Sequence, residues 1–352
     1  MHTMPTSTAK IANTMLRKRF RLGEFLAEKL ITATAVLSLS FIVLIFIFVF
    51  RETLPIFSTP KEPVSSESLG EQETYGDVQM STAEKSVEVK RKGTIETDEG
   101  ASAANLSGTR WQPVSNKPKY GLLPLIVGSF TVSIIAIVIA APIGILAALF
   151  TAAFAPKWMK DILKPVIEIL AGIPSVVIGF FALVVLATYI QDLFGFEYRL
   201  NAFVGGLALS FAVIPIIFTI SEDAITAVPK SLNEASLALG ATKWQTALKV
   251  VLPAATPGIF AAVILGIGRA FGETMIVLMA TGNAALLSGN PFEPVRTMSA
   301  TIGAEMAEVV FGETHYTVLF LIGSILFLFT FLLNAVAEIF IRQRLMKKFK
   351  GN

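Results

Sequence analysis

Cysteine is absent from the 352-residue sequence, and its two histidines, His2 and His315, lie at opposite ends of the chain. These absences exclude disulfide frameworks, thiol nucleophiles and metal sites built from histidine and cysteine. Charge is also scarce: charged residues make up 16% of the chain and hydrophobic residues 53%, whereas a globular domain averages about 25% charged. The net charge of +3 is too small to indicate a nucleic acid partner. This composition argues against an ordinary soluble enzyme.

Long apolar runs accompany the scarcity of charge. A helix needs about 20 apolar residues to cross the hydrocarbon core of a bilayer, which is about 30 Å thick. Six runs meet this requirement, namely 31–50, 122–154, 166–190, 201–220, 258–281 and 317–341. The four charged residues inside these runs are Glu168, Arg269, Glu273 and Glu338. We therefore predict an all-α membrane protein with six transmembrane helices.

The connections between the runs differ in charge. The arm before residue 31, the 155–164 connection and the residues after 341 are rich in lysine and arginine, whereas 282–314 contains four glutamates and one arginine. Because cytoplasmic connections carry the excess of lysine and arginine, both termini are predicted to be cytoplasmic. The predicted parts are a cytoplasmic arm (1–30), a first transmembrane helix (31–50), an extracytoplasmic loop (51–120), a core with five further transmembrane helices (121–345) and a cytoplasmic tail (346–352).

The segment 58–109, within the extracytoplasmic loop, differs in composition from the rest of the chain. It mixes acidic and basic residues with serine, threonine and glycine, and it nearly lacks aromatic residues. Such a segment contains too little apolar surface to form a core of its own. We expect a largely flexible insertion.

The third run is interrupted at Gly172–Ser175, which contains Pro174. A break inside a membrane helix is tolerated only where neighbouring protein or a water-filled cavity satisfies the freed backbone groups. Pro174 and Ser175 are therefore candidates for a gate or an interface, and a simple packing kink is the alternative. Glu168, at the cytoplasmic end of this run, is a candidate for the same role, although a structural role is favoured for both Glu168 and Glu338.

Residues 221–256, the predicted cytoplasmic connection between the fourth and fifth runs, contain two helix-start signatures. Ser231–Glu234 and Thr242–Gln245 both have the capping-box pattern, in which the first and fourth side chains each bond to the other residue's backbone N–H. Gly240, between them, suits the left-handed residue that follows a helix. The pattern predicts two short helices joined by a sharp turn, a rigid shape that another protein can bind.

The order of residues in this loop also matches a known pattern. Glu234, Ala235 and Ser236, then Gly240, then Val250-x-Leu-Pro resemble the EAA loop of ATP-binding-cassette (ABC) importer permeases, with serine and valine in place of alanine and isoleucine. The resemblance implies a type I ABC importer permease fold, in which Glu234, Ala235 and Gly240 form part of a coupling helix–turn–helix that docks on a cytoplasmic ATPase. The chain has no G-x-x-x-x-G-K-[ST] phosphate loop, so ATP hydrolysis requires a separate subunit.

Two opposite charges, Arg269 and Glu273, lie inside the fifth run, with Arg269 near its middle. An arginine at the centre of a bilayer costs about 2.5–3.5 kcal/mol on insertion scales. Glu273 is four residues further along, on the same face of a helix, so the two side chains can pair. The pair either locks helix packing or lines a solute path. The second interpretation is favoured, because apolar residues would stabilise the packing equally well.

Further segments match one branch of this permease family. They are Gly268–Met275, Ala171–Val177, Trp111–Pro113, Tyr120–Pro124 and Arg296–Met298, followed by His315 and Tyr316. From about Trp111 to Arg344 the chain resembles the PstC-type permease of the phosphate-specific import system. The insertion 58–109 departs from the family pattern, because it is longer than expected.

This resemblance implies ATP-driven import of inorganic phosphate by alternating access across the bacterial cytoplasmic membrane. It assigns substrate translocation to Arg269, Glu273 and Thr274. A guanidinium donates hydrogen bonds to phosphate oxygens, and a carboxylate can accept one from the proton that phosphate still carries near neutral pH. The implied partners are a PstA-type permease in a heterodimer, two PstB-type ATPase subunits that use ATP and magnesium, an extracytoplasmic PstS-type phosphate-binding protein and membrane lipid. The chain itself is expected to be no enzyme and to bind no cofactor or metal.

The alternatives concern the substrate and the source of energy. A permease of the same architecture could carry sulfate or molybdate, or the chain could be the PstA-type half. A secondary transporter or channel that needs no ATPase could also use the Arg269–Glu273 pair. A membrane-anchored sensor would need a ligand domain in 58–109, which has too few apolar residues to fold. An intramembrane enzyme would need a nucleophile–base pair or a metal cluster, which the runs lack.

Overall fold

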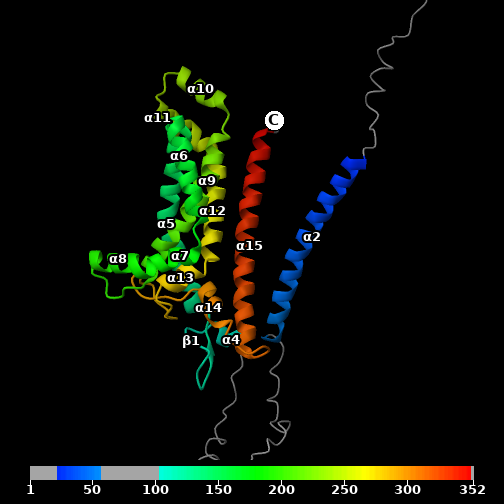
Figure 1. The fold of residues 1–352 in the computed structure, drawn as a ribbon, viewed down its shortest axis with the longest axis vertical. Helices are drawn as coiled ribbons and strands as arrows, with labels where there is room; N and C mark the ends of the chain where they lie inside the picture. Colours follow the sequence, from blue (N-terminus) through cyan, green and yellow to red (C-terminus); the bar gives the residue numbers. More distant parts are fainter. Residues whose placement is uncertain (1–21, 57–102, 350–352) are drawn as a thin grey trace, which may run out of the picture. The chain divides into compact units, whose positions relative to one another are not determined.

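The computed structural model describes residues 22–56 and 103–349, with side chains described for 25–56 and 105–339. The chain divides into two compact units, Met1–Arg51 and Glu52–Asn352 (Figure 1). In the first unit, helix α2 (Leu22–Thr53) exposes large apolar side chains along its whole length. A helix without a polar face suits contact with lipid. Most of the predicted arm 1–30 and of the insertion 58–109 lies outside the described residues.

Six of the described helices are long and apolar enough to cross a membrane, which confirms the predicted number. They span Phe25–Ile56, Leu123–Ala153, Ser175–Phe194, Ala202–Thr226, Lys243–Phe271 and Thr314–Ile339. The largest differences from the predicted bounds concern the third and fifth runs. The third helix begins at Ser175 rather than at 166, and the fifth runs from Lys243 to Phe271 rather than from 258 to 281.

The later start of the third membrane helix has a local cause at Pro174. Residues ahead of the membrane helix form a separate amphipathic helix, α6 (Lys157–Gly172), and Pro174 directly precedes α7 (Ser175–Phe181). Ile173, between them, is extended, with φ −68° and ψ 125°. The residue before a proline is disfavoured in the helical conformation, so the helix ends there. The predicted run 166–190 therefore combines the end of one helix with the start of the next.

The chain continues from α7 through a π-helical turn, η3 (Ala182–Leu186), into α8 (Ala187–Phe194). Arg199 donates a hydrogen bond from Nη1 to the carbonyl oxygen of Leu183 at 2.7 Å. A π-helical turn disturbs the regular backbone bonding of a helix, and here a side chain from the following loop satisfies one of its carbonyls.

Three helices form the centre of the second unit: α5 (Leu123–Ala153), α9 (Ala202–Thr226) and α12 (Leu252–Phe271). Their contacts depend on glycine. A Cβ atom on Gly206 of α9 would lie 2.6 Å from Cβ of Ile135 on α5, and one on Gly258 of α12 would lie 2.4 Å from Cβ of Ala224 on α9. Such small residues let membrane helices approach closely enough for their backbones to pack.

The two ends of the second unit carry different short elements (Figure 1). At one end lie α10 (Lys230–Ala238) and α11 (Lys243–Thr246), which precede α12 in the chain. At the opposite end lie α13 (Met275–Ala280) and α14 (Met298–Glu305), which follow it. Helix α12 therefore connects the two ends.

A small hairpin joins the end that carries α14. Strand β1 (Trp111–Gln112) pairs antiparallel with β2 (Lys119–Tyr120), so that Trp111 lies opposite Tyr120. These two aromatic residues belong to an apolar cluster with Val318 of α15 (Thr314–Phe349). The short helix η1 (Leu54–Ile56) also packs against α15.

The last residues of the predicted insertion, 103–109, form a short helix and contact the rest of the second unit. Residues Ala103–Leu106 form helix α4, and the carbonyl of Leu106 accepts a hydrogen bond from the backbone N–H of Leu122 at 2.9 Å. Gly108 and Gly121 are in close contact, because a Cβ on Gly121 would lie 2.4 Å from the oxygen of Gly108. These tertiary contacts hold a segment whose composition alone predicts disorder.

Candidate functional site

Arg269 lies at the end of a helix rather than in the middle of one. Helix α12 ends at Phe271, the chain turns through Gly272–Thr274, and α13 begins at Met275. The predicted continuous span over 258–281 is therefore wrong, and the expected position of Arg269 near the centre of that span is wrong with it. In the turn, the N–H groups of Gly272 and Glu273 still donate to Gly268 and Ala270, both at 3.3 Å.

The predicted pairing of Arg269 with Glu273 is present. Nη1 of Arg269 lies 2.5 Å from Oε2 of Glu273, although a break in the helix separates the two residues. The two side chains differ in environment, since that of Glu273 is 3% exposed and that of Arg269 is 41% exposed. The pair therefore combines a buried acceptor with a guanidinium that still faces outward.

The position of Glu273 also favours its negative charge. Its other oxygen, Oε1, faces the backbone N–H of Ile276 in the first turn of α13 at 3.5 Å. A carboxylate near the N-terminus of a helix is stabilised by the partial positive charge of the free N–H groups. Both the guanidinium and the helix start thus help to offset the cost of burying this carboxylate.

Helix α14 packs against the turn that carries Glu273 and Thr274. Oγ of Ser299 donates a hydrogen bond to the backbone oxygen of Glu273 at 2.6 Å. A Cβ on Gly303 would lie 2.5 Å from Cγ2 of Thr274, so only glycine leaves room for this threonine. Ser299 and Gly303 are not predictable from the sequence as part of this site, because neither belongs to a local pattern that includes residues 269–274.

The predicted helix–turn–helix in the loop 221–256 is present, but its first helix begins differently. Helix α10 follows Pro229 directly and has no side-chain cap, so the predicted capping box at Ser231–Glu234 is wrong. Pro229 occupies the N-cap position two residues earlier than the pattern predicts, which places Ser231 inside the helix. A residue inside the helix cannot occupy the N-cap position.

The turn after α10 and the start of α11 match the prediction. Gly240 has a φ of +86°. Its N–H donates to Leu237, and that of Ala241 donates to Ser236, the two bonds of a Schellman motif. The capping box at Thr242 is also confirmed: Gln245 N–H donates to Oγ1 of Thr242 at 3.2 Å, and Oε1 of Gln245 accepts from Thr242 N–H at 2.9 Å.

Contacts between α10, α11 and α5 fix this end of the molecule while its surface stays open. The hydroxyls of Ser236 and Thr246 lie 3.0 Å apart, and the ring of Trp244 lies 5.6 Å from that of Phe154. No residue of α10 is buried, and the side chain of Leu239 is 89% exposed. Glu234, Ala235 and Gly240 all lie on exposed positions. This exposed helix pair carries apolar side chains, among them Leu239 and Trp244, and presents a surface that a partner can cover.

Comparison with known proteins identifies the family. The family described as binding-protein-dependent transport system inner membrane component matches residues 140–345. This chain belongs to that permease family. The probable ABC transporter permease protein YqgH of Bacillus subtilis is 44% identical over 227 residues, which cover 64% of this chain and 74% of that protein. The phosphate transport system permease protein PstC of Xylella fastidiosa is 34% identical over 278 residues, which cover 72% of this chain and 84% of that protein.

Among solved structures, an inward-facing conformation of the MetNI methionine ABC transporter aligns with 63% of this permease and 94% of that chain. The sequence identity is 20% and the TM-score is 0.46. The family match and the six apolar helices establish that the permease is a multi-pass membrane protein with the predicted fold class.

The predicted gate or interface residues of the permease lie along and after α6. Glu168 is exposed on α6, Pro174 precedes α7, and Ser175 is the first residue of α7. The ion pair of α6 is instead formed by Lys164, whose Nζ lies 2.8 Å from Oε2 of Glu222 on α9. Glu222 is buried, although it lies within the 221–256 segment that the hydropathy pattern assigns to a cytoplasmic loop.

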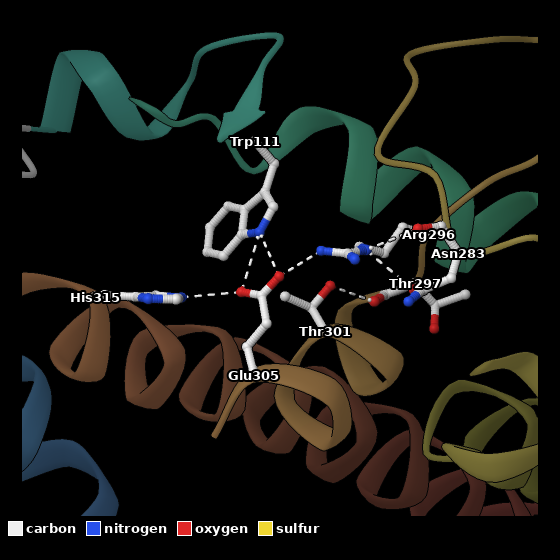
Figure 2. Close-up of polar contacts among 7 residues, drawn as sticks. All are labelled: Trp111, Asn283, Arg296, Thr297, Thr301, Glu305 and His315. Atoms are coloured by element: carbon white, nitrogen blue, oxygen red, sulfur yellow. Dashed lines mark hydrogen bonds and ion pairs between the residues drawn. The ribbon is translucent and has the colours of Figure 1, made fainter. Parts of the chain in front are cut away.

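A second polar cluster of the permease surrounds Glu305, the last residue of α14 (Figure 2). Trp111 donates from Nε1 to both carboxylate oxygens, at 3.1 and 3.2 Å, and Nε2 of His315 lies 2.9 Å from Oε2. Arg296 forms an ion pair with Oε1 and donates from Nε to the backbone and side-chain oxygens of Asn283 at 3.1 and 3.0 Å. Figure 2 shows these side chains converging on the carboxylate.

The surroundings of Glu305 change its pKa. Burial raises the pKa of a carboxyl group, but here the hydrogen bonds from His315 and Trp111 and the charge of Arg296 outweigh burial, so the pKa of Glu305 is lowered. The ionised carboxylate therefore stabilises the fold. The part of the chain that the structure describes contains no group of three or more histidine, aspartate or glutamate side chains placed to bind a metal ion.

The lowered pKa predicts how the stability of the permease depends on pH. The contribution of Glu305 is fully present above the ordinary carboxyl pKa of 4.5 and is lost as the pH falls through the lower value of the folded state. The Tm of purified protein should therefore exceed that of Glu305→Gln near neutral pH, and the gap should narrow below pH 4.5. Glu308→Gln, which changes an exposed carboxylate three residues further on, serves as the control. A gap that stays constant or widens as the pH falls would contradict the assignment.

Proposed function

We propose that this chain is the PstC-type membrane subunit of an ATP-driven importer of inorganic phosphate. The observation that carries the proposal is the Arg269–Glu273 pair, held at a break between two helices in a permease whose relatives include phosphate transport system permeases. An intramembrane charge pair is costly and is retained mainly where it serves a solute path.

The chemistry of the pair suits phosphate. A guanidinium carries five N–H donors in a planar fork that matches oxyanion geometry, and the salt bridge to Glu273 uses Nη1. Because the side chain of Arg269 is 41% exposed, its remaining donors can reach a passing anion. Glu273 accepts a hydrogen bond from protonated phosphate, whereas sulfate has no proton to donate near neutral pH. Thr274, the next residue, supplies a hydroxyl beside the pair.

Energy coupling follows from the continuity of the fifth membrane helix. One helical segment runs from Lys243, beside the exposed turn at Gly240, to Phe271, two residues beyond Arg269. We assign Glu234, Ala235 and Gly240 to a surface that docks a cytoplasmic ATPase. A displacement of α10 and α11 by ATP binding to that ATPase would move α12 and the turn at its far end. Through this movement the solute path would open alternately to the two sides of the membrane.

The proposed assembly contains the partners of such an importer. They are a PstA-type permease in a heterodimer, two PstB-type ATPase subunits that use ATP and magnesium, and an extracytoplasmic PstS-type binding protein. In this orientation both termini and the end with α10 are cytoplasmic. The chain binds no cofactor itself. In this proposed topology the arm 1–30 and the tail 346–352 are cytoplasmic, the loop 51–120 is extracytoplasmic, and the core 121–345 crosses the membrane.

The partner permease would contact the face that contains α6. This helix has no buried residue, and the side chains of Trp158 and Ile169 are 62% and 68% exposed. Glu168, Pro174 and Ser175 lie along the same segment. Exposed apolar side chains beside charged ones are typical of a protein interface rather than of contact with lipid alone, so we favour an interface over a gate for these residues.

Replacement of Glu273 tests the transport site. Glu273→Gln keeps the shape of the side chain and removes its charge, and the loss of a charge-assisted hydrogen bond should lower phosphate uptake by about 10- to 100-fold. Inhibition of the residual uptake by sulfate should become stronger. Uptake would be measured in vesicles that contain all subunits, with Asp192→Asn, an exposed carboxylate on α8, as the control. Unchanged uptake and selectivity in Glu273→Gln would contradict the proposed role.

Replacement of Gly240 tests the docking surface. A β-branched residue in the left-handed conformation costs about 1–2 kcal/mol, so Gly240→Val should reshape the turn after α10. We expect co-purification of the ATPase subunit to fall about tenfold, the change that about 1.4 kcal/mol would cause. Gly195→Val is a matched control, because Gly195 also has a positive φ, +69°, and open space around it. Equal binding of the ATPase by both variants would favour a transporter that needs no ATPase.

A further inference from the structure

We propose that Glu305 is a positioning residue for the Arg269–Glu273 site and acts on it through helix α14. The proposal rests on the proposed function and adds to it a residue group that contacts neither Arg269 nor Glu273 directly. Glu305 lies at the last position of α14, and the first turn of the same helix contacts the turn that carries Glu273 and Thr274.

The end of α14 at Glu305 is held from three other parts of the second unit. Trp111 belongs to β1, His315 to the first turn of α15, and Arg296 to the segment ahead of α14. Arg296 in turn holds Asn283, which is the one non-glycine residue of the described chain with a positive φ, 47°. These contacts tie together four segments that are remote from one another in the sequence.

The charge of Glu305 is unfavourable in the absence of this cluster. A carboxylate at the C-terminus of a helix faces the partial negative charge of the free carbonyl groups. Glu305 is also partly buried, with a side-chain exposure of 15%. Arg296, Trp111 and His315, which all contact the Glu305 carboxylate, compensate for the cost of its burial and for the repulsion by the helix C-terminus. Loss of the negative charge at Glu305 would leave Arg296, whose side chain is 19% exposed, without its ionic partner and would loosen this end of α14.

The other end of α14 is fitted closely to the transport site. Thr297 caps the helix by accepting a hydrogen bond from Ala300 N–H at 3.2 Å, and its hydroxyl lies 3.2 Å from that of Ser299. Ser299 donates to the Glu273 backbone, and Gly303 leaves room for Thr274. Since α14 has eight residues, it is about 12 Å long and short enough to move as one rigid body. A shift at Glu305 therefore displaces the turn at residues 272–274.

The first test measures coupling between the two ends of α14. In vesicles that contain all subunits and take up phosphate, Glu305→Gln should lower the maximal uptake rate about tenfold, whereas Glu308→Gln should leave it near that of the wild type. Ser299→Ala, which removes the link to Glu273, should make the effect of Glu305→Gln smaller in the double variant, because residues that act through one element are not additive. Additive effects, or equal rates in Glu305→Gln and Glu308→Gln, would overturn the proposal.

The second test does not depend on phosphate transport. The chain has no cysteine, so Met275→Cys, at the start of α13, provides a single reporter beside the site. The rate of labelling by a small thiol reagent should change at least threefold on adding Glu305→Gln and should not change on adding Glu308→Gln. Equal labelling rates would overturn the proposal even if phosphate uptake is confirmed. A changed rate in a protein that does not transport phosphate would support the positioning role and reject the proposed substrate.

A milder variant covers the case in which Glu305→Gln fails to assemble with its partners. Trp111→Phe removes the indole N–H donor but retains an aromatic ring against Tyr120 and His315. The expected fall in maximal uptake rate is about threefold, with the same loss of additivity in combination with Ser299→Ala. Wild-type uptake in Trp111→Phe together with unchanged labelling of Met275→Cys would overturn the proposal.

Discussion

The carboxylate of Glu273 is buried at the point where helix α12 ends, and much of the surrounding structure follows from the cost of burying a charge. A buried carboxylate needs a cation or several donors close to it. Arg269 supplies the cation at 2.5 Å, and the start of α13 supplies the positive end of a helix. The break between α12 and α13 brings Arg269 and the start of α13 to the same carboxylate. A continuous helix over 258–281 would supply the arginine but not the helix start.

The same break connects the site to both ends of the molecule. In one direction α12 leads back through α11 to the exposed turn at Gly240. In the other direction Ser299 and Gly303 join the break to α14, whose far end is held at Glu305 by Trp111, Arg296 and His315. One connection is the helical segment Lys243–Phe271 and the other is the short helix α14, and we propose that movement at either end reaches the turn that carries Glu273.

Local patterns in the sequence predicted the features that depend on near neighbours. Hydropathy gave the six membrane helices, spacing gave the Arg269–Glu273 pair, and the capping box at Thr242 and the left-handed Gly240 gave the helix–turn–helix. The errors have local causes as well. Apolar composition continues through the breaks at Ile173 and Gly272, where backbone geometry decides, and Pro229 begins α10 in place of Ser231.

Contacts that depend on the tertiary fold could not be predicted from the sequence. Glu305 and Trp111 are 194 residues apart and meet only because the hairpin packs against α15. The link from Ser299 to Glu273 likewise spans 26 residues and joins α14 to the turn between α12 and α13. A lone glutamate or serine carries no signal of such a partner, since its neighbours in sequence are the same whether or not the contact forms.

Substrate competition tests most directly whether the Arg269–Glu273 pair serves the import of protonated phosphate. Uptake of labelled phosphate would be measured in reconstituted vesicles that contain the permease, its partner permease, the ATPase subunits and the binding protein, with excess sulfate or molybdate added. We expect ATP-dependent phosphate uptake that neither anion inhibits. Uptake of sulfate or molybdate in preference to phosphate, or uptake without ATP, would contradict it.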